Sequence, residues 1–357
     1  MTHNILLTGA SGYLGGTVLA RWKDAHLPPY SAFYALVRSA EQGETVKKYG
    51  AEPRIININD HDSITRTIIE KEITMVYFLI DAYTATHQPA LIKALGEVKK
   101  KTGKEVHFLN TTGPKQSSRH GGILIDHPFS DTDPHLYEMQ KDAKSLHDFV
   151  GESVNANVTV IDAAEANGVR SYIFAPCLVY GKGEGFGNLT SIQDVDIVRA
   201  ATKLRQVFKV DNDDPIWPVC HVADTVELYL HILRKILCGE DIGYGKNGFF
   251  LATSGSVHWN KIYGAMANSL AKRGLVDDET VRQATGTDQT KMAESLSVPS
   301  AAVPVLMGGR CFFTAEHGRK IGWKPHYPPE HILEAADDEV AFILKGLGSG
   351  KKRPDVR

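Results

Sequence analysis

The chain has 357 residues, of which 42% are hydrophobic and 23% are charged, a composition typical of a globular protein. Forty basic and 42 acidic residues give a formal net charge of −2, which excludes attraction to nucleic acid or to an anionic membrane through overall positive charge. No apolar run approaches the roughly 20 residues of a membrane-spanning helix. The first predicted strand begins at residue 5 and leaves no room for a signal peptide. We therefore expect a cytoplasmic protein that binds a small molecule, with no nucleic-acid or membrane partner.

The four cysteines and 15 histidines do not form a recognisable metal-binding pattern. The cysteines lie far apart in the sequence, at positions 177, 220, 238 and 311, without a C-x-x-C pair. They are typical of small apolar side chains in a reducing compartment. The histidines show no pair at the spacing of zinc ligands. We expect no metal site.

Short apolar segments alternate with helical segments along the first half of the chain. Strands are predicted at residues 5–8, 32–37, 54–58, 75–80, 105–110 and 171–175, and helices at 13–23, 62–72 and 89–101. This alternation predicts βαβ units and a parallel sheet.

Two helices are predicted between the last two of these strands. The first has Asp133 as N-cap and Pro134 at the first helical position, and its apolar residues continue at helical spacing to Val150. The second covers residues 157–167 and ends at Gly168, a residue suited to a left-handed C-cap.

A glycine-rich segment, TGASGYLG, stands between the first predicted strand and the first predicted helix. Gly9 allows a tight turn, Gly12 allows a pyrophosphate to approach the backbone, and Gly15 allows the helix to pack on the strand. The helix N-terminus offers amide donors to phosphate groups. With the strand before it and the helix after it, the segment predicts a dinucleotide-binding turn. Its contacts with the cofactor are expected from Gly9, Ser11, Gly12, Tyr13, Leu14 and Gly15.

The end of the second strand indicates which dinucleotide binds. A carboxylate at this position would hold the ribose 2′-hydroxyl of NAD, whereas an arginine accommodates the 2′-phosphate of NADP. The strand ends in Arg38 and Ser39, with no acidic residue before Glu41. These residues favour NADP over NAD, although a solvated arginine beside the loop would have the same sequence. Asn59 and Asp60 follow the third strand, where they either contact the adenine edge or form an Asx turn.

With these motifs in place, the chain resembles the extended short-chain dehydrogenase/reductases, the NAD(P)-dependent epimerase/dehydratase superfamily, and in particular uncharacterised fungal members. Later motifs agree with the resemblance: PCLVYG at 176–181, PVCHVAD at 218–224 and IGWKP at 321–325. The resemblance implies a Rossmann-type doubly wound α/β fold. It places the cofactor domain at residues 1–175. A smaller, mainly substrate-binding lobe follows at 176–347, with segments that return to the first domain, and 348–357 is expected to be a disordered tail.

The resemblance also implies further site residues. Cofactor contacts are expected at Ile80 and Pro176, although Ile80 and Asp81 stand where the family commonly has two small residues. A Tyr-x-x-x-Lys pair and a Ser/Thr after the fifth strand perform proton transfer in this family. The matching residues here are Tyr137, Lys141 and Thr112. The family also implies a possible homodimer.

The position of Tyr137 leaves its role open. It lies 39 residues before Pro176, farther than the family spacing, which instead places the tyrosine near 151–153 and the lysine near 155–157. Tyr137 and Lys141 also lie opposite the apolar stripe of their predicted helix, where a solvated pair would lie. If this pair is not catalytic, Thr112, Asn157 and Tyr83 are the next candidates.

Three functions remain open at this point. The first is an NADP-dependent reductase or dehydrogenase of a small-molecule carbonyl or alcohol. The second is an epimerase or dehydratase with tightly held NAD(P), and the third is a non-catalytic NADP-binding sensor.

Several other features have structural interpretations. The glycines at 181, 183, 185 and 187 form either a mobile substrate-side loop or a simple flexible loop. His221 fits the start of a helix. Trp217, Phe249, Phe250 and Trp259 are expected in the core of the C-terminal lobe.

Overall fold

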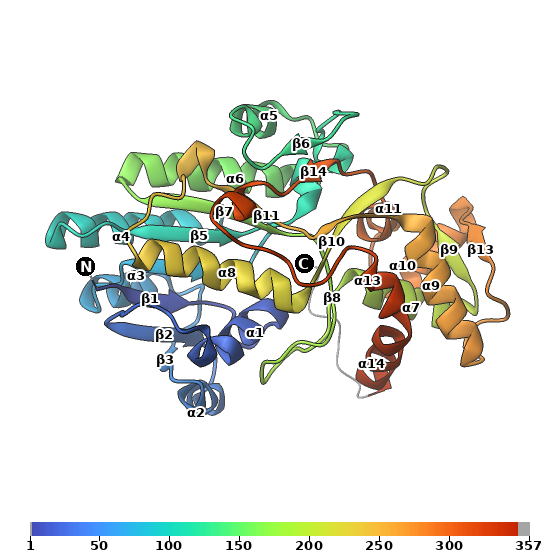
Figure 1. The fold of residues 1–357 in the computed structure, drawn as a ribbon, viewed down its shortest axis with the longest axis horizontal. Coiled ribbons are helices and arrows are strands. Elements are labelled where there is room, and N and C mark those ends of the chain that lie inside the picture. Colours follow the sequence, from blue (N-terminus) through green and yellow to red (C-terminus); the bar gives the residue numbers. More distant parts are fainter. Residues whose placement is uncertain (1, 349–357) are drawn as a thin grey trace.

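A seven-stranded parallel sheet forms the centre of the protein (Figure 1). The structure is a computed structural model and describes residues 2–348. The sheet has the strand order β11-β7-β5-β4-β1-β2-β3, and every neighbouring pair is parallel. Its strands are β1 (Asn4–Leu7), β2 (Ala32–Val37), β3 (Glu52–Ile55), β4 (Met75–Phe78), β5 (His107–Thr111), β7 (Arg170–Pro176) and β11 (Phe249–Ala252). The order reverses between β1 and β4, and in open α/β sheets ligands bind at the carboxyl ends of the strands at such a reversal.

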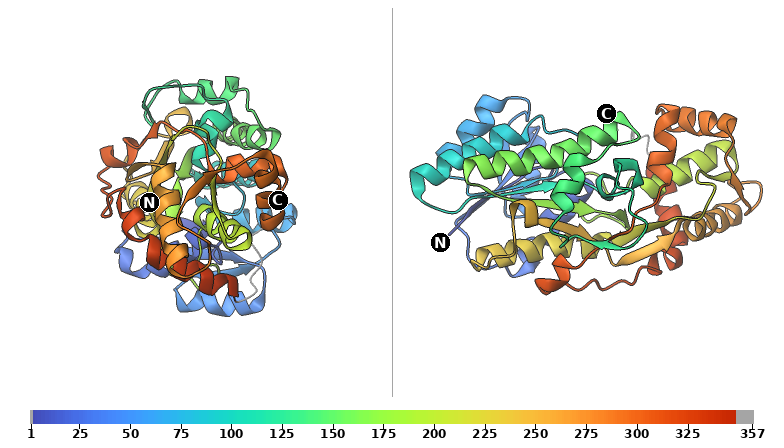
Figure 2. Two further views of the ribbon diagram at one scale, coloured as in Figure 1. Left: turned by 90° about the vertical axis from the view of Figure 1, so that its right-hand side faces the viewer. Right: turned by 90° about the horizontal axis from the view of Figure 1, so that it is seen from above.

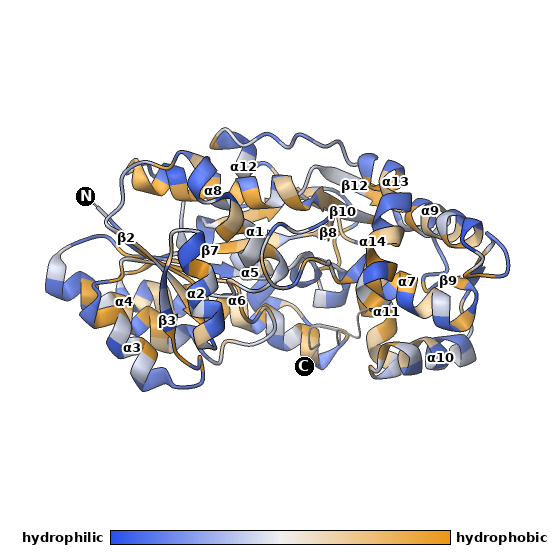
Figure 3. Cartoon of the chain, turned by 90° about the horizontal axis from the view of Figure 1, so that it is seen from below, coloured by the Kyte–Doolittle hydropathy of each residue, from blue (hydrophilic) through white to orange (hydrophobic). Residues whose placement is uncertain are grey.

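Helices cover both faces of this sheet (Figure 2). The strand residues alternate between two apolar clusters: Leu6 belongs to one, whereas Ile5 and Leu7 belong to the other. The Leu6 side is covered by α3 (His61–Glu70), α4 (Gln88–Thr102) and α6 (Asp148–Asn167), and the opposite side by α1 (Tyr13–Arg21) and α8 (Val222–Leu237). The helices carry hydrophobic and hydrophilic residues on different sides (Figure 3), as expected where one face packs on a sheet. The predicted doubly wound α/β fold is confirmed.

The C-terminal lobe is built around a small three-stranded sheet of order β12-β10-β8. Its strands are β8 (Leu178–Tyr180), β10 (Ile216–His221) and β12 (Gly255–His258), and β9 (Val207–Lys209) pairs with β13 (Val281–Gln283) nearby. The helices of this part are α7 (Gln193–Leu204), α9 (Trp259–Lys272), α10 (Gly286–Leu296), α11 (Val303–Met307), α13 (His331–Glu334) and α14 (Ala336–Gly348).

The chain returns to the first domain after entering this lobe. Helix α8 packs against α1, and β11 extends the main sheet beyond β7. Phe249 and Phe250 are therefore buried in the main sheet, so their predicted place in the C-terminal lobe was wrong, whereas Trp217 and Trp259 are buried in the lobe as expected. Farther along, α12 (His317–Lys320) contacts β11, and β14 (Phe313–Thr314) pairs with β6 (Phe129–Ser130).

Three features of the helices depart from the sequence-based prediction, beyond small shifts of element ends. The helix predicted from Pro134 to Val150 is interrupted: α5 (Leu136–Asp142) ends at Ala143, whose backbone is extended, and α6 begins at Asp148 and includes the predicted segment 157–167. Asp133 does not cap α5; its carboxylate accepts a hydrogen bond from the His135 backbone before the helix begins. A helix without a strong apolar pattern, α2 (Ala40–Lys48), follows β2.

Two expectations concern the ends of the chain and the membrane. Gly348, the first residue of the expected tail, is the last residue of α14, and the rest of that tail lies outside the described residues. Within residues 2–348, no helix combines the length and the apolar composition that crossing a bilayer requires.

Candidate functional site

The glycine turn, residues 9–15, connects β1 to α1 at the carboxyl edge of the sheet. Gly9 has a φ of +70°, and a Cβ at this position would lie 2.6 Å from the carbonyl oxygen of Leu79. A Cβ on Gly15 would collide with the carbonyl oxygen of Gly9. Gly12 donates its N–H to the Gly9 carbonyl, with an N–O distance of 2.8 Å. Both outer glycines are therefore required by close backbone approach, as the motif predicts.

The N-terminus of α1 has neither a side-chain cap nor an acidic residue in its first turn. The N-cap residue is Gly12, which has no side chain. The first-turn N–H groups thus have no side-chain cap, and the helix dipole favours negative charge at this end. These residues fit the phosphate groups of a dinucleotide.

The end of β2 places Arg38 and Ser39 at the surface. Both are exposed. The Ser39 hydroxyl accepts a hydrogen bond from the Gln42 N–H and caps α2, with an O–N distance of 3.2 Å. The Arg38 side chain has no ion pair among the described residues, which leaves its guanidinium available to a phosphate.

Asn59 and Asp60 are both exposed in the loop after β3. The Asn57 side chain accepts from the Asn59 N–H, which makes an Asx turn, and Asp60 caps α3 by accepting from the Ser63 N–H. Its hydrogen bonding with Ser63 lowers the pKa of the Asp60 carboxyl. The Asx-turn interpretation therefore describes this loop, and a contact of these residues with adenine stays a prediction.

The remaining predicted cofactor contacts lie on the neighbouring strands. Ile80, after β4, is 42% exposed, so an apolar side chain is presented to solvent at this edge. Asp81 does not face outward as a free charge, because its carboxylate accepts from the backbone N–H groups of Tyr83 and Thr84. Pro176 is the last residue of β7.

The second glycine-rich segment lies directly on the first. In this segment, the glycine strap (residues 181–188), a Cβ on Gly185 would lie 2.6 Å from the Cα of Gly16, and one on Gly187 would collide with the carbonyl oxygen of Ser11. Glycine is thus required here because backbone packs on backbone. The alternating glycines were visible in the sequence, but we interpreted them as either a mobile substrate-side loop or a simple flexible loop, and neither interpretation included this backbone contact.

Hydrogen bonds hold the glycine strap to the turn and to α1. The Tyr13 hydroxyl donates to the Gly181 carbonyl, at 2.6 Å, and the Asn188 N–H donates to the Ser11 carbonyl, at 2.9 Å. Arg21 and Glu184 form an ion pair along the same contact. Tyr13 therefore has a partner in the C-terminal half of the chain, which the motif did not predict for this residue.

Thr112 lies at the carboxyl end of β5, where the sequence placed it. Its backbone N–H donates to the Phe174 carbonyl at 2.8 Å, and its side chain is 5% exposed. The hydroxyl oxygen has no hydrogen-bond partner in the described part of the chain. Thr112 thus has an unsatisfied, buried hydroxyl at the edge where such sheets bind ligands.

Tyr137 and Lys141 differ from Thr112, because the Tyr137 hydroxyl already has a hydrogen-bond partner. Tyr137 is buried, which excludes the solvated alternative, and its hydroxyl donates to the Asp162 carboxylate at 2.6 Å. This hydrogen bond raises the pKa of Tyr137 to about 12, the opposite of the shift that a proton donor near neutral pH requires. Lys141 is exposed, and its ammonium lies 5.6 Å from the centre of the Tyr137 ring.

Helix α6 carries the positions at which the family spacing places the tyrosine and the lysine. Ser153 and Asn157 lie one turn apart there, and both are buried. The Ser153 hydroxyl donates to the Val150 carbonyl, and Asn157 donates to Gln140 on α5. Asn157, an alternative candidate in our sequence analysis, therefore belongs to a buried polar layer. His221, by contrast, caps α8 through Nδ1, as expected of a structural residue.

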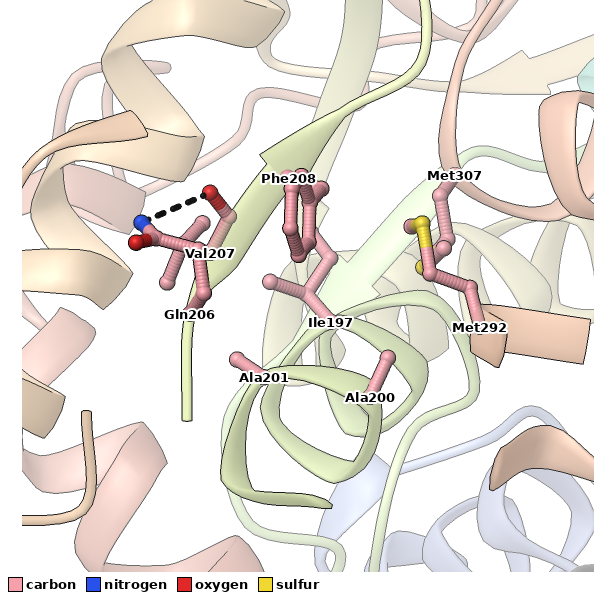
Figure 4. A pocket seen from close by; sticks show the side chains of 8 residues that line it. All are labelled: Ile197, Ala200, Ala201, Gln206, Val207, Phe208, Met292 and Met307. Atoms are coloured by element: carbon pink, nitrogen blue, oxygen red, sulfur yellow. Dashed lines mark hydrogen bonds between the residues drawn. The ribbon is translucent and has the colours of Figure 1, made fainter. Parts of the chain in front are cut away.

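A small internal cavity of about 10 Å³ lies away from these residues, in the C-terminal lobe (Figure 4). It is lined by Ile197, Ala200, Ala201, Gln206, Val207, Phe208, Met292 and Met307. A cavity of this size holds at most one water molecule. It is a packing defect of the lobe and not a substrate site.

Known proteins resemble this chain in fold and, at low identity, in sequence. No family model matches the chain. A curated protein from an Acremonium species, named oxidase ucsJ, is 19% identical over 346 residues, which cover 92% of this chain and 94% of that protein. Its name describes an oxidase.

Solved structures share the fold at low sequence identity. A UDP-glucose 4-epimerase from Thermotoga maritima, solved with UDP-glucose, has a TM-score of 0.63 and 14% identity, and the match covers 96% of this chain and 99% of that one. A dTDP-glucose 4,6-dehydratase from Bacillus anthracis, solved with NAD, has a TM-score of 0.64 and 12% identity over 96% and 97% of the two chains. These likenesses show that the chain shares the fold of an epimerase and a dehydratase, both of which are enzymes.

Proposed function

We propose that the chain is an NADP-dependent oxidoreductase that acts on a small-molecule carbonyl or alcohol. The observation that carries this proposal is the glycine turn, whose outer glycines are required by backbone contacts and whose helix N-terminus has neither a side-chain cap nor an acidic residue. When bound there, a nicotinamide cofactor supplies or accepts a hydride at the substrate carbon. The oxidase that is 19% identical supports an oxidoreductase, whereas the epimerase and the dehydratase that share the fold support the second candidate below equally well.

Arg38 supports NADP as the cofactor. Its exposed guanidinium follows β2, and Glu41 is already inside α2. An arginine can bind the 2′-phosphate in a charge-assisted, bidentate manner. The dehydratase that was solved with NAD supports a nicotinamide dinucleotide as the cofactor. It does not distinguish NADP from NAD for this chain.

The cofactor assignment is tested by the affinities of NADP⁺ and NAD⁺ for wild type and Arg38→Ala. We expect the variant to bind NADP⁺ about 10- to 100-fold more weakly, the range for a hydrogen bond to a charged group, and NAD⁺ with unchanged affinity. Arg282→Ala is a matched control, because Arg282 is an exposed arginine in the C-terminal lobe. A preference of the wild type for NAD⁺ would contradict the NADP assignment and would leave the fold assignment unaffected.

In this proposal Thr112 orients the reacting oxygen. The environment of Tyr137 argues against the role that we assigned to it with Lys141, since its proton is held by Asp162. The test is NADPH oxidation over a panel of aldehydes and ketones. We expect Thr112→Val to lower kcat/KM by about tenfold, the loss of one hydrogen bond, and Tyr137→Phe to stay within about threefold of wild type. A fall of about a hundredfold in Tyr137→Phe, typical of a lost general acid, would restore the Tyr137–Lys141 pair.

A second candidate is an epimerase or dehydratase that holds NAD(P) tightly. The contact of the glycine strap with the glycine turn favours it, because a covered turn slows cofactor exchange. Nucleotide retained through purification, with no net NADPH consumption, would identify this class. Binding of NADP⁺ without turnover of any kind would indicate the sensor. The homodimer stays a prediction, which sedimentation of the purified protein would check.

A further inference from the structure

The glycine strap extends from the C-terminal lobe to the nucleotide half of the chain. It begins directly after β8, and the loop that follows this strand reaches α1 (Figure 1). The loop is closed near its ends, because the Gly183 N–H donates to the Leu189 carbonyl at 2.9 Å. In the nucleotide half the strap contacts Ser11, Tyr13, Gly16, Thr17, Arg21 and Tyr49. The strap thus lies along α1, from the first residue of the helix to its last.

The strap contacts the residues on both sides of the N-cap of α1. The Ser11 carbonyl accepts from the Asn188 N–H at 2.9 Å, and the Tyr13 hydroxyl donates to the Gly181 carbonyl at 2.6 Å. Gly12, between them, is the N-cap, where the free N–H groups of the first turn begin. A phosphate bound by these N–H groups would therefore lie beside the strap.

Gly181 is the residue at which the strap leaves β8. Its φ of +94° lies in the left-handed region, and a Cβ there would collide with the ring of His221. Both polar groups of its backbone are held, because its carbonyl accepts from Tyr13 and its N–H donates to the Glu339 carboxylate at 2.9 Å. Glu339 is 5% exposed and belongs to α14, so a residue of the C-terminal lobe holds the base of the strap.

A second glutamate holds the middle of the strap. Glu184 accepts two hydrogen bonds from Arg21, one of them from Nε at 2.8 Å, and its backbone N–H donates to the Thr17 hydroxyl at 3.1 Å. The Arg21 and Glu184 side chains are 33% and 41% exposed, so water screens the pair. The ring of Phe186 lies 6.2 Å from that of Tyr49, measured between centres. A few polar bonds and one aromatic contact thus hold the strap, as is typical of segments that open locally.

We propose that the glycine strap is a lid over the phosphate end of α1, with Gly181 as its hinge and with Glu339 and Glu184 as the latches that hold it closed. The inference rests on the proposed nucleotide-binding function and adds how exchange of the nucleotide is regulated. The nucleotide enters and leaves when the strap lifts, so both rate constants depend on the population of the lifted state. Glu339 acts from the C-terminal lobe, through the backbone of Gly181.

The test measures NADPH association and dissociation by stopped-flow fluorescence, and hydrogen exchange in peptides that span the strap without nucleotide. The variants are Glu184→Ala, which removes the half-exposed latch, and Glu339→Met, which removes the buried acceptor and keeps a side chain of similar length. Glu240→Ala is the matched control, because Glu240 forms a half-exposed ion pair with Lys235 outside the strap. Glu184→Ala is expected to keep the fold and tests the lid even where Glu339→Met does not fold.

We expect both NADPH rate constants to rise together in the two variants. The rise should be about 2- to 5-fold in Glu184→Ala, the range for an exposed ion pair, and about 2- to 10-fold in Glu339→Met, the range for one hydrogen bond. The dissociation constant should stay within about twofold of wild type, because the latches hold the strap in the same way before and after binding. Hydrogen exchange of the strap should rise by the same factors, and Glu240→Ala should change neither quantity.

Three results would overturn the inference. The first is faster exchange of the strap with unchanged NADPH rate constants, and the second is unchanged exchange of the strap in both variants. The third is slower association with weaker binding, which indicates a damaged turn. A wild type that binds no NADPH would instead reject the proposed function, and faster exchange in the variants would then still show that the two glutamates hold the strap.

Discussion

The two glycine-rich segments use the same residue for different physical reasons. In the glycine turn, Gly9 has a positive φ and Gly15 allows the turn to close on itself. In the glycine strap, Gly185 and Gly187 have ordinary backbone angles and are required by the neighbouring chain, because a side chain would meet Gly16 or Ser11. The first segment is self-contained, whereas the second depends on a contact between distant parts of the sequence.

This difference predicts how each segment tolerates a methyl group. The turn cannot move without distorting β1 and α1, to which it is directly joined. The strap is a loop of the C-terminal half and can lift from α1 at the loss of a few hydrogen bonds. Substitutions in the turn should therefore be more damaging to nucleotide binding than substitutions in the strap.

The largest effect is expected for Gly15→Ala. Its Cβ would collide with the Gly9 carbonyl oxygen, so the turn itself must shift. We expect NADP⁺ affinity to fall by about a hundredfold or more, since the phosphate donors are displaced together, each contributing roughly 1.5 kcal/mol or more. Titration of NADP⁺ measures this loss.

Gly264→Ala is the matched control for an added methyl group. Nothing lies within 4 Å of a Cβ at this position in α9. We expect its free energy of unfolding to rise by about 0.5–1 kcal/mol, because alanine is the better helix former. Wild-type affinity in Gly15→Ala would contradict the assigned role of the turn.

A smaller effect is expected for Gly185→Ala. Its Cβ would lie 2.6 Å from the Cα of Gly16, and the strap must lift to relieve the contact. The free energy of unfolding should fall by about 1–3 kcal/mol, typical of overpacking, with a loss of NADP⁺ affinity well below that of Gly15→Ala. Chemical denaturation and titration give the two quantities. Equal binding losses in the two variants would show that the strap is part of the nucleotide site.

The smallest effect concerns the far end of the strap and depends on pH. Glu339 of α14 accepts a hydrogen bond from the Gly181 N–H at 2.9 Å, and burial raises the pKa of this carboxyl to about 6, from an ordinary value of 4.5. The folded state thus favours the protonated form. This contribution to stability is complete below about pH 4.5 and is lost as the pH rises through 6.

Glu339→Gln imitates the protonated form and should remove this dependence. Between pH 4.5 and 7 we expect the free energy of unfolding of wild type to fall by at most about 2 kcal/mol relative to the variant. Denaturation curves at several pH values check it. Asp194 also has a raised pKa, caused first by burial and then by the charge of Glu339, so Glu339→Gln removes that second contribution as well and the difference between the two proteins reports the pair. Parallel stability curves for the two proteins would contradict the prediction.

Much of the nucleotide half was predictable because its signals are local. The strand at residues 32–37, the turn at Gly9, and the C-cap at Gly168 each depend on residues that are neighbours in the sequence. Helix α2 was missed because its apolar pattern is weak, and the break at Ala143 was missed because the apolar spacing continues across it.

The candidate site was predictable only in part. Thr112 was placed correctly at the end of its strand, since a residue that follows a parallel strand lies at the ligand-binding edge. Tyr137 was not, because its environment depends on Asp162, which lies 25 residues farther along the chain. No local pattern distinguishes a tyrosine that faces a carboxylate from one that faces a cofactor.

The amino-acid sequence by itself therefore determined the parallel sheet, the glycine turn and the residue types available at the edge of β5. Only the tertiary structure decided that the glycine strap packs on the turn, that Asn157 of α6 donates a hydrogen bond to Gln140, and that the Tyr137 hydroxyl donates a hydrogen bond to Asp162. The physical reason is the range of the interactions. Backbone turns and helix caps are formed by residues a few positions apart, whereas Tyr13 and Gly181 meet across 168 positions of the chain.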